Sequence, residues 1–258
     1  MTEGIASAFV ADDRWFSGIF GYSVYRVDCQ SAPSALTAGG LLRAHAEHRA
    51  HALYYAKVDT VDVQMVRALS SAGFYVVDVN VMLALPNLTM AAPVVASTGI
   101  RVCDFQPEFR AGVLNIASTT FEFSRFHLDP GIPRALAHQI KHDWILNYAE
   151  GQRGDRLLVA VIDGEPAGFL AALVSEHDGL ATATIDLVGV SIDYRRRGVG
   201  RALVEAFVGA YRPRCAALRV GTQVANTPSL RLYESLGFSI TGSAYVMHRH
   251  VGGGDQVS

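Results

Sequence analysis

Hydrophobic positions after residue 100 repeat alternately with the two-residue period of a strand and the longer period of a helix. Pro133 suits the first turn of a helix, and Gly151 suits its end. Asp163-Gly164, between two apolar runs, predicts a hairpin turn. The strand pattern covers 100–105, 156–162, 167–176, 182–192, 215–224 and 238–250, and the helix pattern covers 108–118, 133–151, 200–211 and 227–237. This part of the chain is therefore predicted to be an α+β domain with a mixed, mainly antiparallel sheet.

One stretch of the N-terminal region parallels the end of the chain. Residues 66–82 and 230–247 both read as a helix, a glycine stop and a strand, with Gly73-Phe74 matching Gly237-Phe238. The N-terminal region is thus expected to be a smaller α/β domain that is a partial copy of the second, unless the similarity arose by chance. Two residues in or just before the second stretch, Tyr233 and Asn226, differ in the first copy. Leu69 stands at the place of Tyr233, and Asp62 stands at the place of Asn226.

A composition shift divides the chain near its middle. Residues 85–99 hold two prolines among small and polar residues and show no helical period, which indicates a linker. We expect an N-terminal domain at 1–88, a linker at 89–98, the second domain at 99–250 and a flexible tail at 251–258.

Composition limits the classes of partner. Half of the 258 residues are hydrophobic, 18% are charged and the net charge is −2, so we expect a packed core and no affinity for nucleic acid or an anionic membrane. The longest apolar stretches are too short to span a bilayer, and the N-terminus has no signal-peptide pattern. The scattered Cys29, Cys103 and Cys215 match no metal-ligand spacing. A cytoplasmic protein with reduced thiols and no metal is expected.

The stretch "DYRRRGVGRAL" at 193–203 carries the most positive run of the chain at the start of a predicted helix. A helix N-terminus offers unpaired backbone N–H groups, and glycine lets the backbone approach an anion closely. Nearby arginines add charge-assisted hydrogen bonds. The pattern Arg195-x-x-Gly198-x-Gly200 therefore suits a pyrophosphate, although a solvated turn explains it as well. It matches neither a P-loop nor a dinucleotide-binding fingerprint.

The stretches "VGVSIDYRRRGVGRAL" and "ANTPSLRLYESLGF" closely resemble the GCN5-related N-acetyltransferase (GNAT) superfamily, over roughly residues 100 to 250. The resemblance implies a GNAT fold with acetyl-CoA as co-substrate. It implies that the backbone at Val188 and Val190 pairs with the pantetheine arm, that Asn226 holds the pantetheine or the helix start, and that Tyr233 lies near the sulfur. The pyrophosphate would be held by the segment comprising Arg195, Arg196, Arg197, Gly198, Val199 and Gly200.

Acetyl transfer in such a site needs little covalent machinery. An unprotonated amine attacks the thioester directly, and the departing thiolate then needs a proton, which the phenol of Tyr233 can supply as general acid. Asp186 lies four residues before Val190, so strict alternation would place both side chains on one face of the strand. Asp186, acting through water, is the candidate base, and a structural salt bridge is the equal alternative.

Three further stretches indicate the acceptor. "FSRFHLDPGIP", "DWILNYAEG" and the N-terminal "WFSGIFGYSVYRV" resemble the TDP-fucosamine acetyltransferases, which act on nucleotide-linked amino sugars. The resemblance implies a TDP-4-amino-4,6-dideoxyhexose as acceptor. The loop offers a phosphate partner, two stacking rings and two groups for hydroxyls or the amine: Arg125, Phe123, Phe126, His127 and Asp129. An aromatic loop that only packs over the core is the alternative.

Two other functions remain open. The acceptor could be a polyamine, an antibiotic or a protein amine, or the fold could bind acyl-CoA without catalysis. His138 and His142 are spaced for one helix face, but with no third ligand we expect a solvated face rather than a metal site. The sequence leaves a homodimer open.

Overall fold

The computed structural model of the chain describes residues 9–85 and 99–252. The expected α+β fold with a mixed sheet is confirmed: helices alternate with strands that hydrogen-bond in the order β1-β2-β3-β10-β4-β9-β8-β7-β6-β5. The expected linker 89–98 and all but the start of the expected tail lie outside the described residues. Within the described part of the chain, no helix combines the length and the apolar character needed to cross a membrane.

Contacts divide the chain into two compact units, neither of which is one continuous stretch. The described residues 9–80, 128–136 and 243–252 form the first unit, and 81–85, 99–127 and 137–242 form the second. Strands β4 and β10 each begin in one unit and end in the other. The domain bounds expected from the sequence follow the chain, whereas these units follow contacts, so those bounds stay a prediction.

The first unit combines helices with a small mixed sheet, and its core includes the buried residues Leu42, Tyr54 and Leu69. Strand β2 pairs in parallel with β3 along its whole length, and β3 pairs antiparallel with the end of β10. The elements of this unit are β1 (Val10–Asp12), α2 (Arg14–Phe20), β2 (Ser23–Val27), α3 (Ala35–Glu47), β3 (Ala52–Asp59), α4 (Val63–Ser71) and the start of β4 (Tyr75–Ala84).

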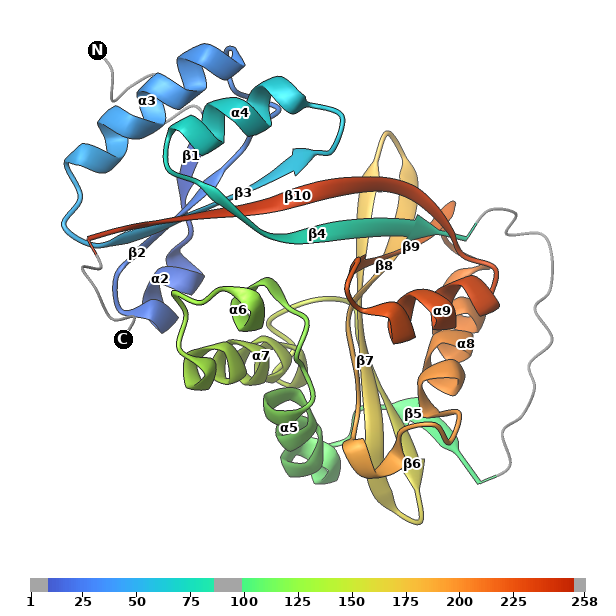
Figure 1. Cartoon of the computed structure of the whole chain (residues 1–258). Coiled ribbons are helices and arrows are strands. Elements are labelled where there is room, and N and C mark those ends of the chain that lie inside the picture. Colours follow the sequence, from blue (N-terminus) through green and yellow to red (C-terminus); the bar gives the residue numbers. More distant parts are fainter. Residues whose placement is uncertain (1–8, 86–98, 253–258) are drawn as a thin grey trace. The chain divides into compact units, whose positions relative to one another are not determined.

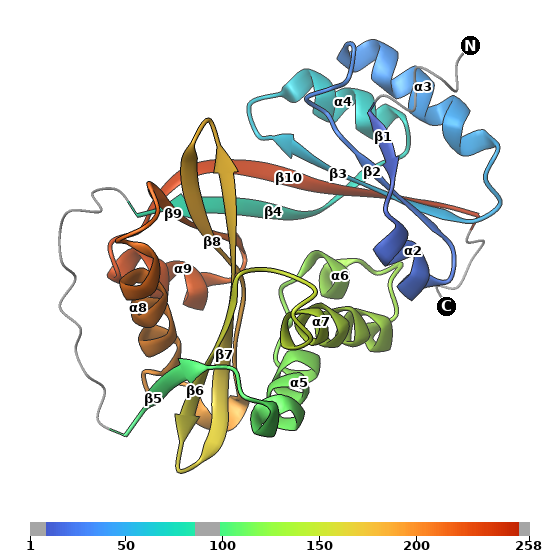
Figure 2. The same ribbon diagram turned by 180° about the vertical axis from the view of Figure 1, so that it is seen from behind.

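The second unit carries helices on both faces of its sheet. Figures 1 and 2 show α5 and α7 on one side of strands β6 to β8, and α8 and α9 on the other. A separate apolar cluster lies under each pair of helices. The elements are β5 (Arg101–Asp104), α5 (Arg110–Thr119), α6 (Arg125–Leu128), α7 (Arg134–Ala149), β6 (Arg156–Ile162), β7 (Glu165–His177), β8 (Leu180–Val190), α8 (Val199–Tyr211), β9 (Ala217–Gln223), α9 (Thr227–Ser235) and β10 (Ser239–Val251).

The expected strands and helices of the second unit are all present, with ends shifted by at most two residues. One feature differs from the expectation: the aromatic segment predicted as a loop contains the short helix α6. Leu85 extends the pairing of β4 on β9, since its amide donates to the Leu218 carbonyl. The mixed sheet of this unit is thus completed by a strand from the N-terminal part of the sequence.

The internal repeat extends beyond the matched stretch. The order strand, helix, strand, helix, strand is the same for β2-α3-β3-α4-β4 and β8-α8-β9-α9-β10, and the first two strands of each set pair in parallel. Asp62 and Asn226 cap α4 and α9 in the same way, each accepting from the amide three residues on. Gly73 and Gly237 both have a φ of 86°, a left-handed conformation that favours glycine after a helix.

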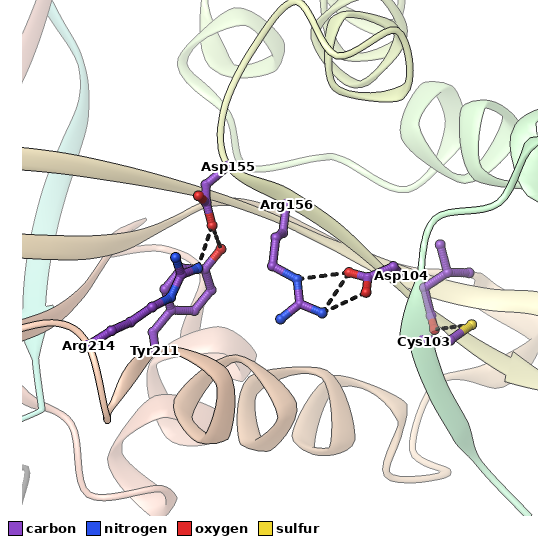
Figure 3. Close-up of polar contacts among 7 residues, drawn as sticks. Cys103, Asp104, Asp155, Arg156, Tyr211 and Arg214 are labelled. Carbon is purple, nitrogen blue, oxygen red and sulfur yellow. Dashed lines mark hydrogen bonds and ion pairs between the residues drawn. The ribbon is translucent and has the colours of Figure 1, made fainter.

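Polar contacts fix the end of α8 and the edge of the sheet within the second unit (Figure 3). The buried Tyr211 hydroxyl donates to Asp155 Oδ2 over 2.5 Å, and Arg214 lies 2.7 Å from the same oxygen. Arg156 makes two parallel hydrogen bonds with Asp104 across β5 and β6. Tyr211 is therefore a structural phenol whose hydroxyl has a partner.

Candidate active site

Strands β8 and β9 pair only in their first halves. Their parallel ladder runs from Thr182↔Ala217 to Ile185↔Val220, whereas β8 continues to Val190. The register of β8 against β7 shifts at this point, because Ala172 faces Ile185 and Ala171 faces Leu187. Asp186 is therefore the additional residue of a β-bulge, a device that bends a strand and often occurs beside active sites. Beyond the bulge, the edges of β8 and β9 diverge and leave backbone groups available to a ligand.

The bulge overturns the expectation that Asp186 and Val190 share a face of β8. One extra residue reverses the alternation of side chains, so that Val188 and Val190 pack against the cluster under α8, while Asp186 contacts α7 on the other side. Gly189 also faces the α5 side, since a Cβ there would meet Phe169 at 2.9 Å. The sheet thus places Asp186 and the valines on opposite faces.

The N-terminus of α8 is built from backbone. Gly198 occupies the N-cap position with a φ of 85°, and no side chain of the described residues caps this helix. Arg196 also has a positive φ, of 62°. Alternation of left-handed residues with ordinary ones turns successive N–H groups toward one point, which forms an anion-binding concavity. These residues fit a diphosphate.

The three arginines before α8 are exposed, but two have contacts within the protein. Arg195 donates to the carbonyl of Thr120 at the end of α5, and the Arg197 guanidinium lies 5.4 Å from the centre of the Tyr194 ring. Gly200 has a packing reason of its own, because a Cβ would lie 3.2 Å from Leu232 on α9. An anion at this turn would meet the backbone amides, whereas Arg195 and Arg197 already have contacts within the protein.

Asn226 holds the start of α9. Its Oδ1 accepts from the Ser229 amide, and its Nδ2 donates to Thr222 Oγ1, each over 3.3 Å. Of the two roles implied for Asn226, the structure contains the helix cap. The contact with pantetheine stays a prediction.

Tyr233 lies on α9 within the core of the second unit. It is 2% exposed, and its ring packs on Phe238 with centroids 5.9 Å apart. Burial raises the pKa of its phenol above the ordinary value of 10, so that the group keeps its proton at neutral pH. A protonated, buried phenol is suited to donate to a departing thiolate, and the general-acid role stays a prediction.

Asp186 is held by three donors on one oxygen. Its Oδ2 accepts from Trp144 Nε1 at 2.8 Å, from the Tyr148 hydroxyl at 2.8 Å and from Arg153 Nε at 2.9 Å. The side chain is 14% exposed and forms an ion pair with Arg153. This arrangement corresponds to the structural salt bridge, which the sequence analysis gave as the alternative to a catalytic base. The role as base, which needs a freely accepting oxygen, stays a prediction.

Lys141 is a candidate functional residue that sequence reasoning missed. It is 6% exposed on α7, and its Nζ lies 5.1 Å from the ring centre of Phe121, 5.2 Å from that of Trp144 and 5.7 Å from that of Phe126. Burial, reinforced by Arg125 and opposed by Asp186, lowers the pKa of Lys141 to about 7. Lys141 occupies a position in the apolar stripe of α7 with Ala137, Ile145 and Tyr148, and that spacing was the available signal.

The predicted acceptor loop packs partly on itself. Phe126 is buried and has the Arg125 guanidinium 4.6 Å from its ring centre, whereas Phe123 is half-buried. His127 Nδ1 lies 2.6 Å from Ser124 Oγ, and its ring packs edge-on against His138. His142, expected on a solvated face with His138, is half-buried beside Asp143.

Asp129 belongs to the first unit, unlike the other four predicted acceptor residues. Its Oδ1 accepts from the Tyr75 hydroxyl and the Gly131 amide, and its Oδ2 lies 2.5 Å from His248 Nδ1 and 2.9 Å from His250 Nε2. Burial opposes its charge, but the hydrogen bonds hold the pKa of Asp129 well below its usual range. Asp129, His248 and His250 are the group among the described residues that could supply three metal ligands, and the expectation of no metal stays a prediction.

Helices on both faces of a mixed sheet, a parallel strand pair that separates at a bulge, and an open helix N-terminus beside it define a GNAT fold. The comparison of families agrees: residues 114–238 match the Acetyltransferase (GNAT) family. The matched segment contains both motifs whose resemblance to this family the sequence indicated.

Two curated relatives show the range of the similarity. The spore coat polysaccharide biosynthesis protein SpsD of Bacillus subtilis is 26% identical over 144 residues, which cover 55% of this chain and 48% of SpsD. The ribosomal protein bS18-alanine N-acetyltransferase of Escherichia coli is 37% identical over 73 residues, which cover 28% of this chain and 49% of that protein. The aligned part spans about half the length of each of these relatives.

Solved structures share the fold over most of the chain. A GCN5-related N-acetyltransferase from Sphaerobacter thermophilus aligns with a TM-score of 0.60 and 17% identity, over 91% of this chain and 75% of its own. A tandem GNAT protein from the clavulanic acid biosynthesis pathway aligns with a TM-score of 0.56 and 15% identity, over 90% and 76%. These likenesses establish the fold.

Proposed function

We propose that the protein is an N-acetyltransferase that transfers the acetyl group of acetyl-CoA to an amine by direct attack in a ternary complex. The observation that carries the proposal is the opening between β8 and β9 at the Asp186 bulge, next to the uncapped N-terminus of α8. The backbone at Val188 and Val190 would pair with the pantetheine arm, and the amides from Arg195 to Gly200 would bind the diphosphate. The match of residues 114–238 to the Acetyltransferase (GNAT) family supports acetyl-CoA as donor.

In this proposal, Tyr233 protonates the departing thiolate. Its burial keeps the phenol protonated, and α9 holds it in an apolar cluster that also contains Val199 and Leu203 of α8. Asn226 and Gly237 define the two ends of α9, so the position of the phenol depends on both caps. Strand-edge amides beyond the bulge would stabilise the oxyanion of the tetrahedral intermediate.

The acceptor that we favour is a nucleotide-linked amino sugar of the TDP-4-amino-4,6-dideoxyhexose type. The segment from α5 to α7 carries aromatic rings and a guanidinium, from Phe121, Trp144 and Arg125, which suit the aromatic base and the phosphates of a nucleotide. The partial similarity to SpsD, named for polysaccharide biosynthesis, favours the same class. The three cysteines are free thiols, which suits the reducing environment of the cytoplasm.

The test is release of free thiol from acetyl-CoA in the presence of four amines: a TDP-4-amino-4,6-dideoxyhexose, spermidine, aspartate and a peptide with an N-terminal alanine. We expect turnover with the amino sugar and a much smaller rate with the other three. Turnover only with another amine would replace the proposed acceptor. Binding of CoA without turnover of any amine would contradict the enzymatic proposal and favour an acyl-CoA-binding module.

A further inference from the structure

The amine of Lys141 is buried beside aromatic rings rather than beside a hydrogen-bonded carboxylate. Phe121 from the segment between α5 and α6, Phe126 from α6 and Trp144 from α7 surround it at ring-centre distances between 5.1 and 5.7 Å. Lysine is among the residues least often buried unless it is paired. Among the described residues, no ion pair of Lys141 with an acid is found. Such a position is costly for an ammonium group and far less so for a neutral amine.

Lys141 lies on the same face of the sheet as Asp186. Trp144, one turn further along α7, contacts both the amine and the Asp186 carboxylate. Asp186 is the bulged residue at which β8 and β9 separate. Figures 1 and 2 show α7 covering this side of β7 and β8, opposite α8 and α9. A donor bound at α8 and an acceptor approaching from α7 would therefore meet near this lysine.

The charged groups around Lys141 favour its neutral form. Arg125 faces it from α6 and opposes a second positive charge. Asp186 faces it from β8, but its Oδ2 already accepts from Arg153, Tyr148 and Trp144. The carboxylate is therefore committed to Arg153, and the lysine is left as the basic nitrogen of this face.

We propose that Lys141 is the catalytic proton acceptor for the incoming ammonium group of the acceptor. This proposal rests on the proposed N-acetyltransferase function and replaces Asp186 as the base. The lowered pKa of about 7 supports it, because a large fraction of Lys141 is then neutral at pH 7 to 8.

The proton balance is complete. The neutral Lys141 amine takes one proton from the acceptor ammonium, and the freed amine forms a C–N bond to the thioester carbonyl. The C–S bond then breaks, and the thiolate takes the proton of Tyr233. The Tyr233 phenolate recovers a proton from the acylated nitrogen, which becomes the neutral amide. Lys141 finally releases its proton to water, so that each turnover yields one amide, one free thiol and one proton.

The chain suits a direct test because it contains only two lysines, Lys57 and Lys141. Protein labelled with carbon-13 at lysine Cε gives two signals, and the variant Lys57→Arg assigns the remaining one to Lys141. We expect this signal to titrate near pH 7, whereas an unperturbed lysine titrates near 10. Titration of Lys141 above pH 10 would overturn the proposal without reference to turnover.

Kinetics over pH 6 to 10 give the second readout. Lys141→Met keeps the length of the side chain and should lower kcat at pH 7.5 by about 100-fold or more, with the KM for acetyl-CoA little changed. The loss should shrink toward pH 10, where the acceptor amine is itself deprotonated. Lys141→Arg, which keeps a charge but cannot give up its proton, should be as slow as Lys141→Met. Lys57→Arg is the matched control and should keep the wild-type rate.

The outcomes separate this proposal from the proposed function. If wild-type protein turns over and Lys141→Met keeps the wild-type pH profile, the lysine assignment falls and the acetyltransferase stands. If Lys141→Arg is active and only Lys141→Met is slow, the lysine binds an anion and is not the base. If wild-type protein turns over no amine, the proposed function itself fails.

Discussion

The two copies of the strand-helix-strand-helix unit differ at the points where a ligand would bind. In the first copy, β2 and β3 pair along all of β2, and Ser34 caps α3 by accepting from the Thr37 amide. In the second, β8 and β9 separate after Ile185, and α8 begins at Gly198 without a side-chain cap. The first copy satisfies its backbone groups internally, whereas the second leaves them open.

The second helix of each copy, α4 or α9, has the same ends in both copies but differs in one buried side chain. α4 and α9 share an Asx cap, a glycine end and a return hydrogen bond from Phe74 to Leu69 and from Phe238 to Tyr233. Leu69 and Tyr233 are equally buried, but only Tyr233 carries a hydroxyl. The two copies thus share the caps and glycines that the fold requires, and the open N-terminus of α8, the separated strands and the Tyr233 phenol are the features of the proposed site.

The largest effect on turnover is expected at Tyr233, the phenol that the second copy has in place of Leu69. Tyr233→Phe should lower turnover by about one to three orders of magnitude with CoA affinity little changed, because only the proton donor is lost. Steady-state kinetics with acetyl-CoA measure it. Tyr211→Phe, which removes a phenol bonded to Asp155, is the control and should reduce stability rather than rate. An unchanged rate in Tyr233→Phe would refute its role.

The equivalent position in the first copy should affect stability. Leu69→Ala removes a fully buried side chain and should lower the free energy of unfolding by about 2–5 kcal/mol. Urea unfolding gives the value, and calorimetry with CoA should show the affinity retained in the folded variant. A loss of CoA affinity in Leu69→Ala, measured where the variant is fully folded, would mean that the first copy takes part in donor binding.

Acid should weaken the first unit through Asp129. Its folded pKa lies below its unfolded value of about 3.9, so its contribution is present above pH 4 and is lost as the pH falls further. Breaking hydrogen bonds to this charged group should cost on the order of 1.5–3 kcal/mol. Urea unfolding of wild type and Asp129→Asn at pH 7, 5, 4 and 3 measures it. If the free energy of unfolding fell equally steeply with pH below pH 4 in wild type and in Asp129→Asn, Asp129 would not be the source of the acid sensitivity.

The smallest effects are expected where the copies agree. Asp62→Ala and Asn226→Ala each remove a helix cap and should each cost about 1 kcal/mol. Thermal unfolding compares the two variants. If Asn226→Ala also weakened CoA binding by tenfold while Asp62→Ala did not, Asn226 would hold the pantetheine in addition to the helix.

Local patterns predicted most elements of the second unit because periodicity, Pro133, Gly151 and the Asp163-Gly164 turn act over a few residues. They predicted the open turn before α8 for the same reason. The bulge at Asp186 was not predictable, since one unpaired residue is defined only by the neighbouring strand. Tyr75 and His248 reach Asp129 from distant segments, and two of the three rings around Lys141, Phe121 and Phe126, precede α7, so neither a loop motif nor a helix pattern reveals these contacts.

The central claim is that backbone amides at the start of α8 bind the diphosphate of CoA. Calorimetry of the purified protein with CoA and with pantetheine, which has the same arm without the diphosphate and the adenosine 3′-phosphate attached to it, tests it most directly. We expect CoA to bind in the micromolar range and pantetheine at least about 100-fold more weakly, a difference of about 2.7 kcal/mol. No measurable affinity for CoA, or equal affinities for both compounds, would contradict the claim.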